Sequence, residues 1–130
     1  MTARLEDPLG PQVRQLFGAL YHAGEPTGTA PVVSGEAGRE QRGTRVRFML
    51  QLCGERVLQA RYRAYGCPYT LAACEWLATR LESAGRGSLG APADWVQQLQ
   101  IPQARLGRLL VVEDALIAAL AAADKSVTDS

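Results

Sequence analysis

The segment ARYRAYGCPYTLAACEWLATRL, residues 60–81, changes its hydrophobic periodicity at Gly66, and this change decides the fold. Before the glycine, apolar and charged side chains alternate, which is typical of a strand with one buried face. After the glycine, apolar residues recur every three or four positions, as in a helix, and the run ends at Gly85. Cys67 therefore lies at the helix N-cap, and Pro68 occupies the first helical position, where its missing N–H costs little.

A second strand is predicted just before this segment. Residues 45–52 alternate in the same way as residues 57–65, and a turn with a glycine joins them, so the two strands form a β-hairpin. We expect one face of the hairpin to be buried and the other to face solvent. The buried face comprises Val46, Phe48, Leu50, Leu52, Leu58, Ala60, Tyr62 and Ala64, and the solvent face comprises Arg45, Arg47, Gln51, Gln59, Arg61 and Arg63.

Helical spacing predicts three further helices, at residues 11–21, 92–100 and 102–123. The last of these is expected to have one side formed by Leu106, Leu109, Leu110, Glu113, Ile117 and Leu120. Residues 24–44 are rich in Gly, Pro, Thr and Glu, so this segment is predicted to be mostly loop, with one edge strand near residues 31–33 as an alternative.

Strands and helices occur in separate blocks of the chain, which favours an α+β fold. We expect a small antiparallel sheet of two or three strands, packed against helices on one face. A chain of 130 residues fits a single domain, residues 1–130, with flexible tails at residues 1–10 and 124–130.

Composition excludes several classes of function. The formal net charge is +1, so nothing in the overall charge favours nucleic acid or an anionic membrane. The arginines of the hairpin lack the interleaved aromatic side chains that single-strand binding needs. The N-terminal residues lack the apolar core of a signal peptide, and no window is long enough to span a membrane. We therefore expect a cytoplasmic protein that binds neither nucleic acid nor membrane.

Three cysteines without a secretory context are expected to be reduced thiols. At a helix N-terminus the local positive potential favours a thiolate, so Cys67 is either a reactive or ligating sulfur or merely a small capping residue. Cys74 belongs to the apolar side of the predicted helix and is expected in the core, whereas Cys53 lies at the hairpin turn. His22, the only histidine, follows the first predicted helix and is interpreted as a favourable charge near its C-terminus, with a ligand role as the alternative.

Two segments resemble the iron–sulfur cluster scaffold proteins, the IscU family and the NifU N-terminal domain. Residues 60–81 look like the strand–Gly–Cys–helix segment of that family. Residues 101–120, IPQARLGRLLVVEDALIAAL, are similar without a gap to its last helix, where Leu-Pro-Pro-Val-Lys precedes a His-Cys pair and then Glu-Asp-Ala. The resemblance covers residues 11–123 and implies the α+β fold of that family.

The family builds or holds its cluster with three cysteines, an aspartate and a nearby histidine. By resemblance, Cys67 matches the middle cysteine. The Cys-Gly-Asp motif of the family falls on Arg42-Gly43-Thr44, and its His-Cys pair falls on Gly107-Arg108. Four ligand positions are thus replaced, and Cys67 is the one candidate metal or sulfur ligand that remains.

The chaperone-recognition segment of the family is reduced to residues 101–105, in which Ile101, Pro102 and Arg105 are the predicted partner-binding residues. The partners implied by the resemblance are a cysteine desulfurase or an Hsp70-type chaperone. The oligomeric state stays open.

The resemblance implies a divergent iron–sulfur cluster assembly scaffold-like protein in which Cys67 carries a labile cluster or a persulfide. Tight metal binding by the monomer is not expected, because one thiol cannot fill the four terminal ligand positions of a [2Fe–2S] cluster. The alternative is a metal-free interaction or regulatory module that docks on the assembly machinery. A thiol-dependent enzyme ranks lowest, since no base beyond His22 is apparent, and we expect the protein not to be an enzyme.

Overall fold

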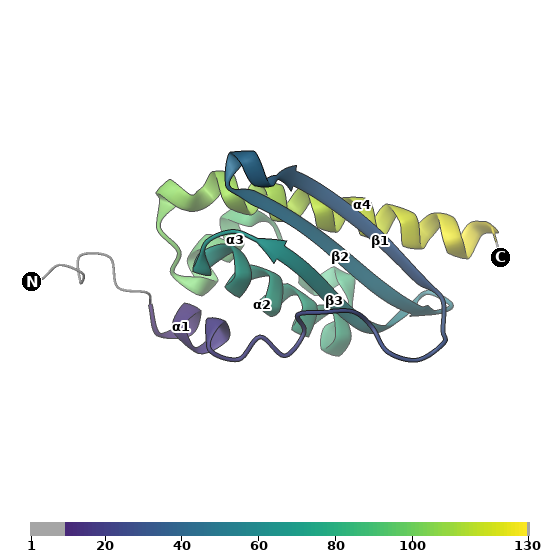
Figure 1. Ribbon diagram of the computed structural model, residues 1–130. Helices are drawn as coiled ribbons and strands as arrows, with labels where there is room; N and C mark the ends of the chain where they lie inside the picture. Colours follow the sequence, from purple (N-terminus) through teal and green to yellow (C-terminus); the bar gives the residue numbers. More distant parts are fainter. Residues whose placement is uncertain (1–9, 130) are drawn as a thin grey trace, which may run out of the picture.

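The computed structural model describes residues 10–129 and shows a three-stranded sheet with helices on one of its faces (Figure 1). The strands are β1 (Val32–Arg39), β2 (Thr44–Cys53) and β3 (Arg56–Tyr65), and the helices are α1 (Pro11–Phe17), α2 (Pro68–Ala84), α3 (Pro92–Leu99) and α4 (Leu106–Asp129). Single 3-10 turns lie at η1 (Glu40–Arg42), η2 (Arg86–Ser88) and η3 (Gln103–Arg105). The predicted tail at residues 1–9 and Ser130 lies outside the described residues.

The sheet is antiparallel throughout, with the strand order β1-β2-β3. The hairpin of β2 and β3 was predicted from alternation, and the structure confirms it. The edge strand given as an alternative near residues 31–33 is present as β1. It is longer than that segment, because it pairs along β2 from Val32 opposite Gln51 to Arg39 opposite Thr44. The α+β prediction is therefore confirmed, with a sheet of three strands.

Helices α2 and α4 cover the inner face of the sheet, α2 along β3 and α4 along β1 and β2, while α1 packs on α2 (Figure 1). The approach of α4 to β1 depends on Gly35, because a Cβ atom there would lie 2.1 Å from the backbone nitrogen of Ala119. Only glycine fits at such a distance. The contact at Gly35 thus fixes how closely helix and sheet can pack.

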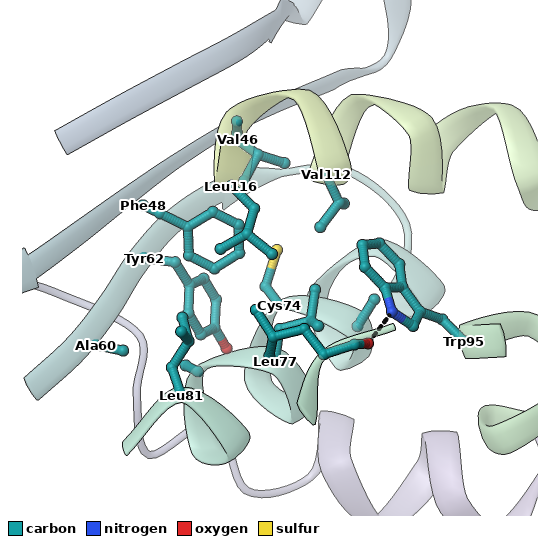
Figure 2. Packing of buried hydrophobic residues seen from close by; sticks show 14 of the residues in the cluster. Val46, Phe48, Ala60, Tyr62, Cys74, Leu77, Leu81, Trp95, Val112 and Leu116 are labelled. Atoms are coloured by element: carbon teal, nitrogen blue, oxygen red, sulfur yellow. Dashed lines mark hydrogen bonds between the residues drawn. The ribbon is translucent and has the colours of Figure 1, made fainter. Parts of the chain in front are cut away.

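The core lies between the sheet and these helices (Figure 2). Phe48 and Tyr62 from the sheet pack with their ring centroids 6.3 Å apart, and Trp95 from α3 donates a hydrogen bond to the Leu89 carbonyl at 2.6 Å. The sulfur of Cys74 points into the cluster, as predicted for a core residue (Figure 2). The other large side chains buried there are Leu50, Leu77, Leu81, Leu99, Leu109, Val13, Val46 and Val112.

Two hairpin residues differ from the predicted pattern. Leu58 was expected in the core but is 44% exposed, because a register shift pairs Gln51 with Gln59 and Leu52 with Val57. Such a bulge leaves Leu58 without an opposite residue and gives the inward position to Val57. Gln51 was expected to face solvent but is buried, because its side-chain amide donates to the Thr27 carbonyl at 2.7 Å. The loop before β1 therefore covers this part of the outer face.

The first and last helices also differ from their predicted extents. α1 ends at Phe17 rather than near residue 21, since Gly18 caps it. α4 begins at Leu106 after the turn η3 and continues to Asp129, so the segment from 124 to 129, predicted as a flexible tail, is helical. The face of α4 turned to the sheet comprises Leu109, Val112, Ala115, Leu116, Ala119 and Ala123, not the predicted set, and Leu110 and Ile117 are exposed. The close approach at Gly35 accounts for Ala115 and Ala119 on this face, because it leaves no room for larger side chains there.

Within the described residues, no helix is both long and apolar enough to cross a membrane.

Candidate functional site

Cys67 occupies the N-cap of α2, directly after β3 ends, as predicted from the sequence. Its backbone is extended, with φ −80° and ψ 170°, and Pro68 follows at the first helical position. The thiol is half-buried, and its Sγ atom lies 3.6 Å from the hydroxyl oxygen of Thr70, three residues further along. The N-cap and third helical side chains of α2 thus face each other, without a side-chain hydrogen bond that caps the helix.

The environment of Cys67 favours the thiolate. Burial alone would raise the pKa of this thiol, but the hydroxyl and backbone amide of Thr70 and the amide of Tyr69 act in the opposite direction. The positive charge of Arg108 adds to their effect, and the pKa of Cys67 falls below the ordinary value of a free thiol. A lowered pKa increases the fraction of nucleophilic sulfur at neutral pH.

The four positions that the resemblance matches to family ligands come together in space. Arg42, Thr44, Gly107 and Arg108 all line one cavity of about 540 Å³, although η1 and the start of α4 lie far apart in the sequence. We call this cavity the arginine pocket. Its lining residues are Gly38, Arg39, Arg42, Thr44, Ala104, Gly107, Arg108 and Val111.

Arg108 joins the arginine pocket to the strand and to the thiol. Its Nη1 atom donates to the hydroxyl oxygen of Thr44 at 3.1 Å and to the carbonyl of Gly43 at 3.4 Å. Gly43 has a left-handed backbone with φ 89°, which turns the chain from η1 into β2 beneath the guanidinium group. Cys67 is not among the residues that line the pocket, and the charge of Arg108 is the link between them.

The residues at this site do not suit a metal centre. Arginine is permanently protonated and has no lone pair to offer a metal. Cys67 is the only thiol near the pocket, since Cys53 is exposed at the hairpin turn and Cys74 is buried in the core. Burial raises the pKa of Cys74, so that thiol stays protonated. Within residues 10–129 no three His, Cys, Asp or Glu side chains are placed to hold one ion.

His22 lies in a different place, on the segment that follows α1. Its Nδ1 and Nε2 atoms contact Glu75 and Glu82 of α2 at 2.5 and 2.9 Å, so both ring nitrogens are occupied. Tyr62 donates to Glu75 at 3.0 Å, and we call these four residues the histidine cluster. Because α1 ends five residues earlier, His22 is not a charge at a helix C-terminus, and its interpretation as such was wrong.

The predicted partner-binding residues fall in unequal environments. Ile101 is 4% exposed and belongs to the core, whereas Pro102 is exposed. Arg105 lies with its guanidinium carbon 5.7 Å from the centre of the Tyr69 ring, two residues beyond Cys67. Their role in docking stays a prediction. Of the three residues, only Pro102 and Arg105 could contact a partner at the surface.

Sequence reasoning did not identify Arg39 and Thr70. Arg39 reaches the arginine pocket because β1 ends beside β2, and β1 was only an alternative in the sequence. Thr70 could have been found from its spacing alone, since the third helical residue after an N-cap lies beside the N-cap side chain.

No protein-family model matches the chain. Over 83 residues, 63% of its length, the chain is 42% identical to a protein named bifunctional protein NifU/MnmA from Rubrobacter xylanophilus. The matched part is 16% of that protein, so the chain spans less than a fifth of the length of this relative. The chain is thus similar to part of a protein whose name includes NifU.

Proposed function

We propose that the protein takes part in iron–sulfur cluster assembly and carries sulfur on Cys67. The observation that supports this proposal best is the environment of Cys67, a half-buried N-cap thiol whose pKa is lowered by Thr70, Tyr69 and Arg108. Two similarities support the assignment to iron–sulfur cluster assembly. The chain is similar to part of a protein named NifU/MnmA, and residues 60–81 resemble the scaffold family.

A cluster held by this chain alone does not fit these residues. The four terminal ligand positions of a [2Fe–2S] cluster need thiolates or imidazoles, and three arginines line the pocket beside the single available thiol. Their charges repel iron cations and favour anionic sulfur. In this proposal the cargo is therefore sulfur, and any cluster would take further ligands from a partner.

The transfer step is a displacement at sulfur. The Cys67 thiolate attacks the outer sulfur of a persulfide on a cysteine desulfurase, and a new S–S bond forms as the donor S–S bond breaks. The donor cysteine leaves as a thiolate, and Cys67 becomes a persulfide, with no net oxidation or reduction. Arg108 stabilises the thiolate before the attack and the persulfide anion after it.

A metal-free interaction module is the second candidate. It is favoured by the same arginines and by the exposure of Pro102 beside Arg105, which leaves a surface for a desulfurase or an Hsp70-type chaperone. Such a module would bind the machinery without accepting sulfur.

Incubation with a cysteine desulfurase and cysteine, without oxygen, separates the two candidates. Intact-mass spectrometry should detect one added sulfur atom per chain, and peptide mapping should place it on Cys67. Cys67→Ser should abolish the addition, and Cys53→Ser should not, because Cys53 is exposed but remote from the site. Binding to the desulfurase without sulfur on Cys67 would support the module instead, and the absence of both would contradict both candidates.

A further inference from the structure

We infer that the arginine pocket binds a small anion with at least two negative charges, either a phosphate compound or a polycarboxylate. The inference goes beyond the proposed function and does not depend on sulfur transfer to Cys67.

The pocket carries positive charge that the described part of the chain does not compensate. Arg39, Arg42 and Arg108 line it, and no lining residue is acidic. Within residues 10–129 these three side chains form no ion pair, whereas Glu36 and Glu40, the nearby carboxylates, both bind Arg45. Four other arginines, Arg45, Arg61, Arg63 and Arg86, have carboxylate partners, whereas Arg47, Arg56 and Arg80 form no ion pair within the described residues but do not share a cavity with one another. Three unmatched guanidinium groups around one cavity attract a multiply charged anion.

Thr44 provides a neutral donor at the same place. It is 4% exposed, and its oxygen accepts the hydrogen bond from Arg108 at 3.1 Å. A hydroxyl that accepts one hydrogen bond can still donate its own hydrogen, and no described residue accepts it. An oxyanion in the pocket would accept this hydrogen and so satisfy the buried hydroxyl. Arginines exposed to water would not need such a partner by themselves.

The shape of the pocket suits a small molecule. Its volume of about 540 Å³ lies in the range of small-molecule sites. Gly107 keeps one wall open, because a Cβ atom added there would meet no other atom within 4 Å. Guanidinium groups bind phosphate and carboxylate oxygens in pairs through their planar fork, and so these two chemical classes fit. The start of α4, at Gly107 and Arg108, adds the positive end of a helix dipole.

Calorimetric titration of the full chain tests the inference, with inorganic pyrophosphate in one arm and citrate in the other. Ionic strength is held constant, since screening weakens such contacts. We expect at least one anion to bind with a Kd below about 1 mM. Arg42→Gln and Arg39→Gln should each weaken binding about tenfold, because each removes a charge-assisted contact. Binding of only one of the two anions identifies the chemical class.

Two further variants separate a built site from general attraction. Gly107→Glu introduces a carboxylate at the open wall and should weaken binding about tenfold or more, without a clash in the fold. Arg56→Gln removes the same charge from the start of β3, at the opposite end of the hairpin from Thr44, and should change the Kd less than about twofold. The inference is wrong if neither anion binds below about 1 mM, or if Arg56→Gln weakens binding as much as Arg42→Gln.

Discussion

Arg108, in the first turn of α4, donates a hydrogen bond to the hydroxyl oxygen of Thr44 at the start of β2, with 3.1 Å between the two atoms. Both residues stand at positions where the resembled scaffold family has metal ligands. Here the pair is an arginine and a hydroxyl, which hold each other and the Gly43 carbonyl in place. We propose that these positions, matched to family ligands by resemblance only, bind anions in this chain rather than cations.

The first prediction concerns thiol reactivity. Cys67 should be alkylated faster than Cys53 or Cys74 at neutral pH, because its pKa is lowered whereas Cys74 is fully buried. Alkylation rates measured against pH, with peptide mass spectrometry to identify the site, give the titration of each thiol. A faster reaction at either other cysteine, or a midpoint for Cys67 above about 8.5, would contradict the account.

Arg108→Gln provides the matched test of the electrostatic contribution. Loss of its charge should raise the pKa of Cys67 and move the alkylation midpoint to higher pH. Arg56→Gln, with the same loss of charge at the far end of the hairpin, should leave that midpoint unchanged. Equal shifts in the two variants would mean that the charge of Arg108 has no specific effect on Cys67.

The second prediction concerns the histidine cluster. His22→Ala should lower the free energy of unfolding by about 2 kcal/mol, because it removes the ion-pair partner of Glu75, whose side chain is 4% exposed and keeps only the hydrogen bonds from the Tyr62 hydroxyl and the backbone amide of residue 22. Tyr21→Ala is the control, since the neighbouring Tyr21 is 82% exposed and should have little effect. Urea denaturation measures both, and a change of less than about 0.5 kcal/mol in the histidine variant would contradict the assignment.

The third prediction concerns acid stability. Burial alone would raise the pKa of Glu82, but the Ala60 amide, His22 and Arg61 outweigh it and lower that pKa below 4.5. A carboxyl group with a lowered pKa in the folded state stabilises the protein above the unfolded pKa, and this contribution is lost as the pH falls through the folded value. Glu82→Gln should therefore lower the free energy of unfolding at pH 7. Below about pH 4.5, the free energy of unfolding of this variant should fall less steeply with pH than that of the parent. If the free energy of unfolding falls with pH in the same way in the variant and the parent, the titration of Glu82 does not contribute to stability.

The fourth prediction concerns helix–sheet packing. Gly35→Ala should destabilise the fold by about 3 kcal/mol, because the added Cβ would lie 2.1 Å from the Ala119 nitrogen. Gly87→Ala is the matched control, because its Cβ would meet no atom within 4 Å. Chemical denaturation compares the two variants, and similar midpoints would show that α4 does not approach β1 as described.

The elements that the sequence predicts well are those with strong local periodicity. The alternation in β2 and β3 and the change of period at Gly66 are local signals, so the hairpin, the N-cap at Cys67 and the end of α2 at Gly85 agree with the structure. The prediction of the packed side of α4 missed Ala115 and Ala119, because their burial depends on Gly35 in another element and hydrophobicity alone ranks leucine above alanine.

At the site, too, some features could be predicted from the sequence and others could not. The resemblance matched Arg42, Thr44, Gly107 and Arg108 to ligand positions of one cluster, and these four residues line one pocket. The histidine cluster could not be predicted, because residues 53 positions apart, His22 and Glu75, carry no shared pattern in the sequence. Leu58 was misplaced for a related reason, since a bulge in the pairing is not visible in alternation.

The most direct test of the central claim, that Cys67 belongs to a former metal site now built for anions, is anaerobic reconstitution with iron and sulfide of two proteins. One is the parent chain, and the other carries Arg42→Cys, Thr44→Asp, Gly107→His and Arg108→Cys together. Iron content and absorbance should show a stable cluster in the four-residue variant and none in the parent, since only the variant gathers enough ligands around Cys67. Circular dichroism confirms that the variant folds. A folded variant that binds no metal, or a parent that holds a cluster lost on Cys67→Ser, would contradict the claim.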